Sequence, residues 1–271
     1  GINVNFIDHG GVSAPTYYNA RGGGWQRSFF GGFLTTCGLT NIGVENKDND
    51  IELGKHGRIS HSPAEQYTAV VEESGDYPSA VLTGTMKETV LFGERLLLQR
   101  RLEVEGAHNR IILHDKLLNE AYHAQEYMML YHFNLGYPFL SPDCELDIPS
   151  SKVIPRDEHA REHIERINRG EEPSSGAEMC YYHHFPSAAD TVTVTARNPA
   201  LGFGLSLTFE RQFLDRLIQW KSMAPGEYVM GLEPATNHVG GRAHERTVDR
   251  ISVLPAQSFK EHTLIINFFD L

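Results

Sequence analysis

The clearest pattern in the chain is a run of alternating residues at 126–138, which predicts a long β-strand that ends at a Gly-Tyr-Pro turn. Alternate side chains of a strand point to opposite faces. One face would carry only apolar and aromatic groups, from Tyr127, Met129, Tyr131 and Phe133. The other begins apolar and ends polar, with Met128, Leu130, His132 and Asn134. This arrangement is typical of a pocket floor, although from this stretch alone two polar residues that only bond backbone are the simpler explanation.

Similar patterns recur along the rest of the chain. Further β-enriched or alternating segments occupy residues 67–73, 79–88, 95–105, 110–119, 191–197, 202–209, 215–221, 227–233 and 262–269. No long helical crossover separates consecutive segments, so antiparallel neighbours are expected. We find no internal repeat. The pattern predicts a mainly β protein: one large antiparallel β-sandwich with little helix, forming a single domain over residues 1–271.

Two regions depart from this pattern. Residues 1–45 are rich in glycine and aromatic side chains, which predicts tight turns or close backbone approach. Residues 141–178 are punctuated by prolines, and the charged stretch 156–168 predicts a short surface helix or an ordered excursion. This stretch contains His159, Glu162 and His163 at a spacing known from one class of metalloproteases. Because the helix has almost no apolar face, we interpret it as a solvated surface helix and predict no metal site.

Composition narrows the classes of function. The chain has 24 Lys and Arg against 35 Asp and Glu, a net charge of -11, which argues against nucleic acid or an anionic membrane as partner. No apolar run approaches the roughly 20 residues of a membrane span. The first residues show no positively charged stretch before an apolar core, so we expect no leader. The three cysteines Cys37, Cys144 and Cys180 are odd in number and lack a CxxC spacing, as expected of reduced thiols in a cytoplasmic protein.

Several kinds of chemistry lack their motifs. The chain has no GxSxG elbow, no phosphate-binding GxxxxGK[ST] loop and no GxGxxG between a strand and a helix. The remaining candidates lie at strand ends or in a glycine-containing loop: His132, Glu233 immediately before Pro234, and His56 with Arg58. Imidazole and carboxylate are the usual pair for moving protons near neutral pH.

Taken in order, these motifs resemble the aldose 1-epimerase (galactose mutarotase-like) superfamily, and more closely an uncharacterised bacterial epimerase-like branch of it. The segment 27–39, Arg-Ser-Phe-Phe-Gly-Gly-Phe-Leu-Thr-Thr-Cys-Gly-Leu, is similar to a signature of that branch. His56-Gly57-Arg58 stands where mutarotases have a His-Gly-Gly loop, and 131–135 resembles the segment with their catalytic histidine. Residues 215–221 followed by 231–234 resemble the segment that delivers their catalytic glutamate.

The resemblance implies a galactose mutarotase-like supersandwich that interconverts the α and β anomers of a sugar, with no cofactor and no metal. It implies Glu233 as the base and His132 as the acid, which a nearby carboxylate would keep protonated. His56, Arg58 and Arg27 would hold sugar hydroxyls or an anionic substituent such as a phosphate or carboxylate. Gln219 or Lys221 would replace the sugar-binding aspartate of the family.

Two alternatives stay open at this point. The protein could be a non-catalytic carbohydrate-binding or sensor protein on the same fold, or another sugar isomerase or lyase that acts at a neighbouring carbon. In each case the expected partner is a small-molecule carbohydrate bound by a monomer or homodimer. The sequence does not name the sugar, because one fold and one acid–base pair serve many substrates.

Overall fold

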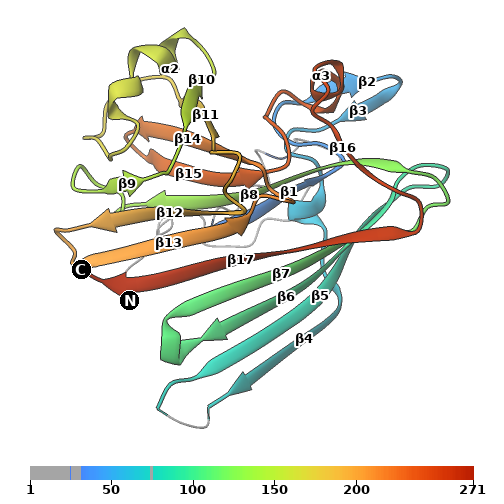
Figure 1. Cartoon of the computed structure of the whole chain (residues 1–271), viewed down its shortest axis with the longest axis horizontal. Helices are drawn as coiled ribbons and strands as arrows, with labels where there is room; N and C mark the ends of the chain where they lie inside the picture. The colour runs from blue at the N-terminus through green and yellow to red at the C-terminus, as the bar shows by residue number, and fades with distance from the viewer. Residues whose placement is uncertain (1–24, 26–31, 74–75) are drawn as a thin grey trace.

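The computed structural model describes residue 25 and residues 32–73 and 76–271. Most of these residues form two large antiparallel sheets (Figure 1). The seven-stranded sheet has the order β1 (Leu34–Leu39), β8 (Gln125–Gly136), β15 (Glu227–Ala235), β14 (Arg216–Ala224), β11 (Met179–His184) and β10 (Lys152–Pro155), with β16 (Ser252–Leu254) also paired to β8. The fold predicted from the sequence, a mainly β antiparallel sandwich with little helix, is therefore confirmed.

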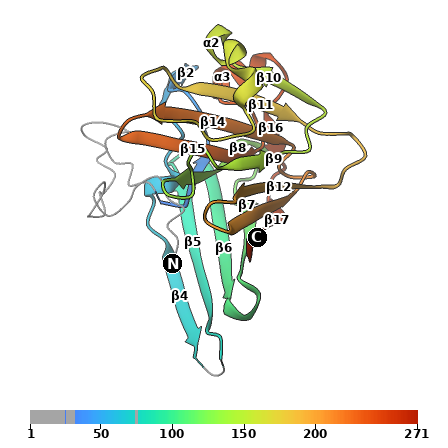
Figure 2. The same cartoon turned by 90° about the vertical axis from the view of Figure 1, so that its left-hand side faces the viewer.

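The eight-stranded sheet contains the predicted run of consecutive antiparallel neighbours. Its order is β4 (Glu65–Glu72), β5 (Ser79–Thr89), β6 (Arg95–Glu105), β7 (Arg110–Asn119), β17 (Ser258–Asp270), β13 (Phe203–Glu210), β12 (Thr191–Asn198) and β9 (Glu145–Asp147). Strands β4 to β6 project away from the rest of the molecule (Figure 2), and β4 is exposed along its whole length. The edge strand therefore lies far from the core that positions the site.

Short elements complete the described part of the chain. A small hairpin pairs β2 (Asn46–Asp48) with β3 (Ile51–Leu53). The helices are α2 (Glu158–Glu162), α3 (Arg242–Thr247) and the 3-10 turns η1 (Ile59–His61), η2 (Gly106–His108) and η3 (Ile164–Arg166). Elements α2 and η3 occupy the charged stretch for which a surface helix was predicted. No helix among the described residues is long and apolar enough to cross a membrane.

The main core lies where the inner faces of the two sheets meet. Leu98, Leu113 and Leu264 come from the eight-stranded sheet, and Met129 and Tyr131 come from β8 on the other side. Each of these side chains is completely removed from solvent, and burial of apolar surface is the dominant favourable term in folding. The apolar face predicted for residues 126–138 is thus the core face of β8.

The opposite face of β8 is buried by a separate, smaller cluster. Met128 and Leu130 pack there with Cys37 of β1 and Ile218 of β14. All three cysteines are free, as the sequence predicted, and all three are buried. Because β8 is covered on both faces, a polar side chain at its end sits above an apolar floor instead of in open solvent.

Candidate functional site

Antiparallel pairing brings His132 and Glu233 together. Strand β15 pairs with β8 so that Leu232 lies opposite Phe133 and Ala235 opposite Leu130, and the same register places Glu233 opposite His132. The two side chains project from the same face of the seven-stranded sheet. His132 Nε2 lies 3.1 Å from Glu233 Oε1, and both residues are almost completely buried.

Space for this pair depends on Gly231. A side chain two residues before Glu233 would point to the same face of β15. A Cβ atom at Gly231 would lie 2.3 Å from Glu233 Oε1 and 3.1 Å from His132 Cε1. The backbone here is extended, so the glycine is required for space and not for a special conformation. Because Gly231 has no side chain, the carboxylate of Glu233 and the imidazole of His132 can come into contact on this face of the sheet.

Burial sets the charge state of the pair. Removal from water raises the pKa of Glu233 well above its usual value, and the negative charge of Glu178 raises it further. Removal from water also lowers the pKa of His132 to about 4. The sequence argument expected a nearby carboxylate to keep His132 protonated, but desolvation of both groups outweighs that attraction. Near neutral pH the pair holds one transferable proton, and burial favours its place on Glu233.

The pair lies in a cavity of about 540 Å³. Trp220 of β14 forms one wall, with its ring centroid 5.6 Å from that of His132. His56 and Trp25 form another, with ring centroids 4.7 Å apart. The imidazole of His56 is 5.9 Å from that of His132, measured between centroids. Aromatic walls and a few polar groups are the usual lining of a small-molecule site.

A tight loop holds His56 in place. Its backbone has a left-handed φ of 55° and donates and accepts hydrogen bonds with Gly43 and Gly38. Its Nδ1 atom accepts the amide hydrogen of Gly43 at 3.4 Å. Burial lowers the pKa of His56, and the nearby His132 lowers it further. His56 is therefore a neutral ring with limited freedom, suited to hydrogen bonding with a ligand hydroxyl.

The sequence analysis did not identify the charged residues at the rim of the cavity. Arg156 Nη1 lies 3.1 Å from Glu178 Oε1, and the Trp220 indole donates to Glu178 Oε2 at 2.7 Å. Lys55 also lines the cavity, with its Nζ 5.9 Å from the centre of the Trp25 ring. Arg156 and Glu178 lie at the ends of short strands in the proline-rich segment, where alternation is too brief to be recognised. Lys55 had a signal, since it precedes His56.

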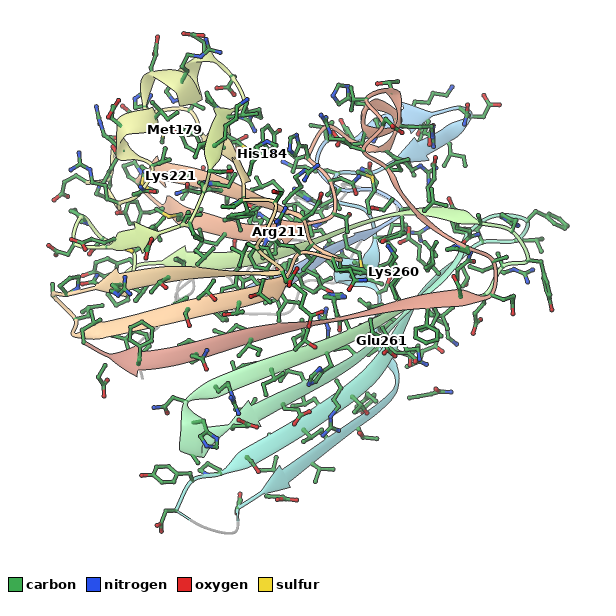
Figure 3. All side chains as sticks on the ribbon, in the orientation of Figure 1. Met179, His184, Arg211, Lys221, Lys260 and Glu261 are labelled. Atoms are coloured by element: carbon green, nitrogen blue, oxygen red, sulfur yellow. The ribbon has the colours of Figure 1, made fainter. Side chains whose placement is uncertain are left out.

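The structure places Gln219 and Lys221, which were predicted to contact the substrate, outside the cavity. Their neighbours Ile218, Trp220 and Ser222 line the cavity, so these two side chains point to the opposite face of β14. Gln219 donates to the carbonyl of Ile167 at 2.7 Å. Lys221, labelled in Figure 3, is 1% exposed and donates to Glu171 Oε1 at 2.8 Å. Both hold the segment 164–171 onto the sheet.

Some of the other predicted residues line the cavity and some do not. His56, His132 and Glu233 come together in the cavity. Arg58 is exposed and is not among the residues that line it. Arg27 lies outside the described residues. Asn134 supports the strand end, as expected, because its side chain donates to the carbonyl of Gly32 at 2.9 Å.

Within the described part of the chain, one group of side chains could hold a metal ion. It consists of His159 and Glu162 of α2 and His163, the residue that follows the helix, outside the cavity. The cavity itself combines proton-transfer groups with aromatic walls, which suits acid–base chemistry on a small polar molecule.

Solved structures with the same fold include several sugar-epimerase relatives. A protein from Klebsiella pneumoniae named as a candidate aldose 1-epimerase matches with a TM-score of 0.85 and 22% identity, over 93% of this chain and 66% of that one. A galactose mutarotase-like protein from Clostridium acetobutylicum has a TM-score of 0.62 and 12% identity, over 89% of this chain and 80% of its own. The galactose 1-epimerase of Lactobacillus acidophilus has a TM-score of 0.52 and 11% identity, over 85% of this chain and 77% of its own.

These likenesses establish the galactose mutarotase-like fold, and this chain spans just under two thirds of the Klebsiella protein's length. No curated protein matches the sequence. A family model described as a domain of unknown function, DUF4432, matches residues 1–268. The chain therefore belongs to the DUF4432 family.

Proposed function

We propose that this protein is an aldose 1-epimerase, which interconverts the α and β anomers of a free sugar. One observation carries the proposal: a carboxylate oxygen and an imidazole nitrogen lie 3.1 Å apart on a cavity floor. The two oxygens that exchange protons in ring opening, the anomeric hydroxyl and the ring oxygen, are bonded to one carbon. Two proton-transfer atoms side by side therefore match a hemiacetal better than two separated reaction centres.

In the proposed mechanism Glu233 removes the proton of the anomeric hydroxyl while His132 protonates the ring oxygen. The bond between the anomeric carbon and the ring oxygen breaks, and a carbonyl forms. After rotation of the aldehyde, the ring oxygen attacks its other face, His132 takes back the proton and Glu233 returns its own. The reactive form has the shared proton on His132, and the 3.1 Å contact allows its transfer from Glu233. Each cycle leaves the pair unchanged.

The cavity suits one sugar ring. Trp220 and Trp25 offer flat apolar surfaces, and His56 offers an imidazole whose ring centroid lies 5.9 Å from that of His132. The charged residues of the lining are Lys55 and Arg156 against Glu178, Glu227 and Glu233. Arg156 already pairs with Glu178. This balance favours a hydroxyl-rich neutral sugar, with Lys55 as the contact for any anionic substituent.

The role assignment predicts the loss of exchange in two variants. Glu233→Gln and His132→Ala should each slow enzyme-catalysed anomer exchange by about 10² to 10⁴, because each removes one proton-transfer group. The decay of freshly dissolved α-anomer would be followed by NMR for glucose, galactose, mannose, xylose and glucose 6-phosphate. His114→Ala, which changes an exposed histidine of β7, serves as the matched control.

Other outcomes would identify a different function. Near-wild-type exchange in either site variant would refute the assignment of acid and base. A sugar that binds without faster exchange would point to a binding or sensor protein. Deuterium from solvent in a carbon-bound position would indicate an isomerase or lyase, because anomer exchange moves only hydroxyl protons. We also propose that residues 1–271 act as one domain, since both sheets share one core.

A further inference from the structure

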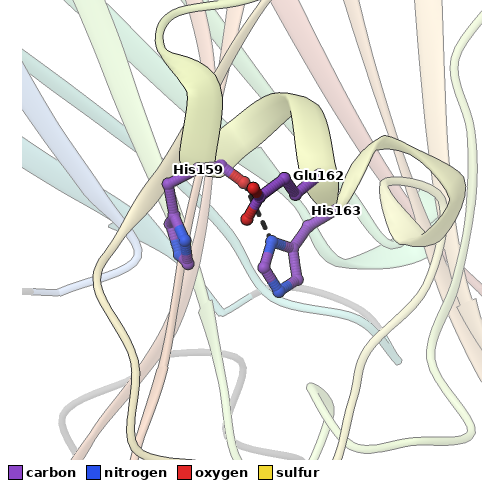
Figure 4. A group of neighbouring side chains, drawn as sticks. All are labelled: His159, Glu162 and His163. Atoms are coloured by element: carbon purple, nitrogen blue, oxygen red, sulfur yellow. Dashed lines mark hydrogen bonds between the residues drawn. The ribbon is translucent and has the colours of Figure 1, made fainter.

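Helix α2 presents two imidazoles and a carboxylate to one region of space. His159, Glu162 and His163 each place one ligand-type atom within 4.8 Å of the others (Figure 4). The two imidazole rings are 4.6 Å apart between centroids. Positions three and four apart share a face of a helix, so the helical backbone itself creates the cluster. The sequence favoured a solvated surface helix without a metal, and the structure brings the three side chains together.

Both imidazole rings have hydrogen bonds that prepare them for a metal. His163 Nδ1 lies 2.8 Å from the carbonyl oxygen of His159, and His159 Nε2 lies 3.1 Å from that of Ala177. A carbonyl only accepts, so each of these nitrogens carries the proton. The other nitrogen of each neutral ring keeps its lone pair, and the described residues give it no hydrogen bond. Histidine ligands of metals normally donate their second N–H in this way.

The carboxylate has the freedom to complete the site. Glu162 is exposed and forms no ion pair among the described residues, while its neighbour Glu158 lies 3.6 Å from Arg161. Ligand atoms of a tetrahedral zinc ion are about 3.4 Å apart, which follows from metal–ligand bonds of about 2.1 Å. Each residue has a ligand-type atom within 4.8 Å of the others, so rotation of the exposed Glu162 side chain and adjustment of the two rings are needed to reach that spacing.

Helix α2 is also joined to the rim of the cavity. Its N-terminal Asp157 accepts the amide hydrogen of Ala160 at 2.9 Å and the Nε hydrogen of Arg156 at 3.0 Å. Arg156 binds Glu178, which binds Trp220. The carbonyl that His159 contacts belongs to the residue immediately before Glu178. The cluster therefore touches both segments that carry the rim residues.

We propose that His159, Glu162 and His163 bind one divalent transition-metal ion of the zinc class, with water as the remaining ligand. Imidazole nitrogens suit zinc, nickel and copper, whereas magnesium and calcium prefer all-oxygen sites. An ion on the free nitrogen of His159 fixes the proton on Nε2 and strengthens its bond to Ala177. The metal thereby fastens the segment before Glu178 to α2. This proposal is independent of the epimerase reaction.

Calorimetric titration of the full chain with zinc chloride at pH 7.5 tests the site. We expect one bound ion in the wild type and at least tenfold weaker binding in His159→Ala and in His163→Ala, because a lost ligand costs more than the 10-fold to 100-fold typical of its supporting hydrogen bond. His244→Ala is the matched control, since it removes an exposed histidine from the other helix, α3, and should leave binding unchanged. Urea unfolding without zinc should match among the variants.

Three results would overturn the proposal. They are no zinc binding by the wild type, wild-type binding by the double variant His159→Ala/His163→Ala, and loss of binding in His132→Ala, which would place the ion in the cavity. Amide hydrogen exchange at residues 171–178 tests the fastening. Zinc should slow amide exchange at these residues in the wild type and not in His163→Ala. Unchanged exchange in the zinc-loaded wild type would refute the proposal that the metal fastens this segment to α2.

Discussion

At the scale of single residues, the site depends on the space that Gly231 leaves on one face of β15. Glu233 and His132 can meet because a side chain at Gly231 would collide with both of them. Burial keeps water away from both groups, which raises the pKa of Glu233 and lowers that of His132. Gly231 therefore controls the geometry of the pair, although it contributes no reacting atom.

Gly231→Ala should separate the pair without unfolding the protein. The new Cβ would lie 2.3 Å from Glu233 Oε1, so the carboxylate must turn away from His132. We expect sugar anomer exchange to fall by about 10²-fold, the usual cost of a misplacement of about 1 Å. NMR exchange rates would be compared with those of Gly54→Ala, where an added Cβ meets no atom within 4 Å. Equal rates in the two variants would contradict the role of Gly231.

At the scale of elements, the sequence predicted the strands well and their register poorly. Alternation identified β8 and both of its faces. The pairing of β14 with β15 decides whether even or odd residues of β14 face the cavity, and alternation within one strand carries no such information. For this reason the sequence could not show that Gln219 and Lys221 point away from the cavity.

Short or atypical elements were also difficult to predict. The segment 34–39 reads as glycine-rich turns, yet it forms β1, because pairing with β8 overrides local propensity. Strand β10 has only four residues, so the neighbouring Arg156 could not be placed at a sheet end. The pair His132 and Glu233 was predictable because both residues sit in long strands and in recognised motifs.

A buried polar network behind β8 ties the two sheets together. Tyr131 points away from the cavity, and its hydroxyl lies 2.5 Å from Asp115 Oδ2 of β7 and 2.6 Å from His262 Nε2 of β17. Arg100 of β6 completes the network with two bonds to Asp115, at 2.8 and 2.6 Å. Side chains of β6, β7 and β17 in the eight-stranded sheet thus form one network with Tyr131 of β8, the strand that carries His132.

Tyr131→Phe should lower stability and leave chemistry intact. The lost hydroxyl leaves His262 and Asp115 each short of one bond, so we expect a loss of about 1–3 kcal/mol in the free energy of unfolding, measured in urea. Tyr181→Phe is the matched control, because the buried Tyr181 hydroxyl has no hydrogen-bond partner among the described residues. Equal stability losses, or slower anomer exchange in Tyr131→Phe alone, would contradict a purely structural role.

At the scale of the whole molecule, buried neutral histidines make the fold sensitive to acid. Burial lowers the pKa of His132, His183, His238 and His262 to about 4. It also lowers the pKa of His56. In the unfolded chain these groups titrate near pH 6.5, so below that pH the unfolded state binds more protons and is favoured. Stability is therefore fully present above pH 6.5 and is lost as pH falls toward 4.

Three carboxyl groups act in the opposite direction. Burial raises the pKa of Glu88, of Glu233 and of the partly buried Asp215, so the folded state takes up these protons first as pH falls. They offset part of the histidine contribution but are fewer than the five histidines. The free energy of unfolding should thus decrease between pH 6.5 and pH 4.5, by on the order of 1.4 kcal/mol per pH unit for each histidine that remains uncompensated.

A substitution at His238 isolates one of these contributions. Its Nε2 atom has no hydrogen-bond partner among the described residues, and its ring stacks on Tyr182 at 4.0 Å between centroids. His238→Phe keeps an aromatic ring there and removes a titrating group, so urea unfolding followed by tryptophan fluorescence should show a shallower loss of stability from pH 6.5 to 4.5. His114→Ala, at an exposed position, should keep the wild-type slope. Stability that stays constant or rises across this range in the wild type would show that burial does not hold these histidines neutral.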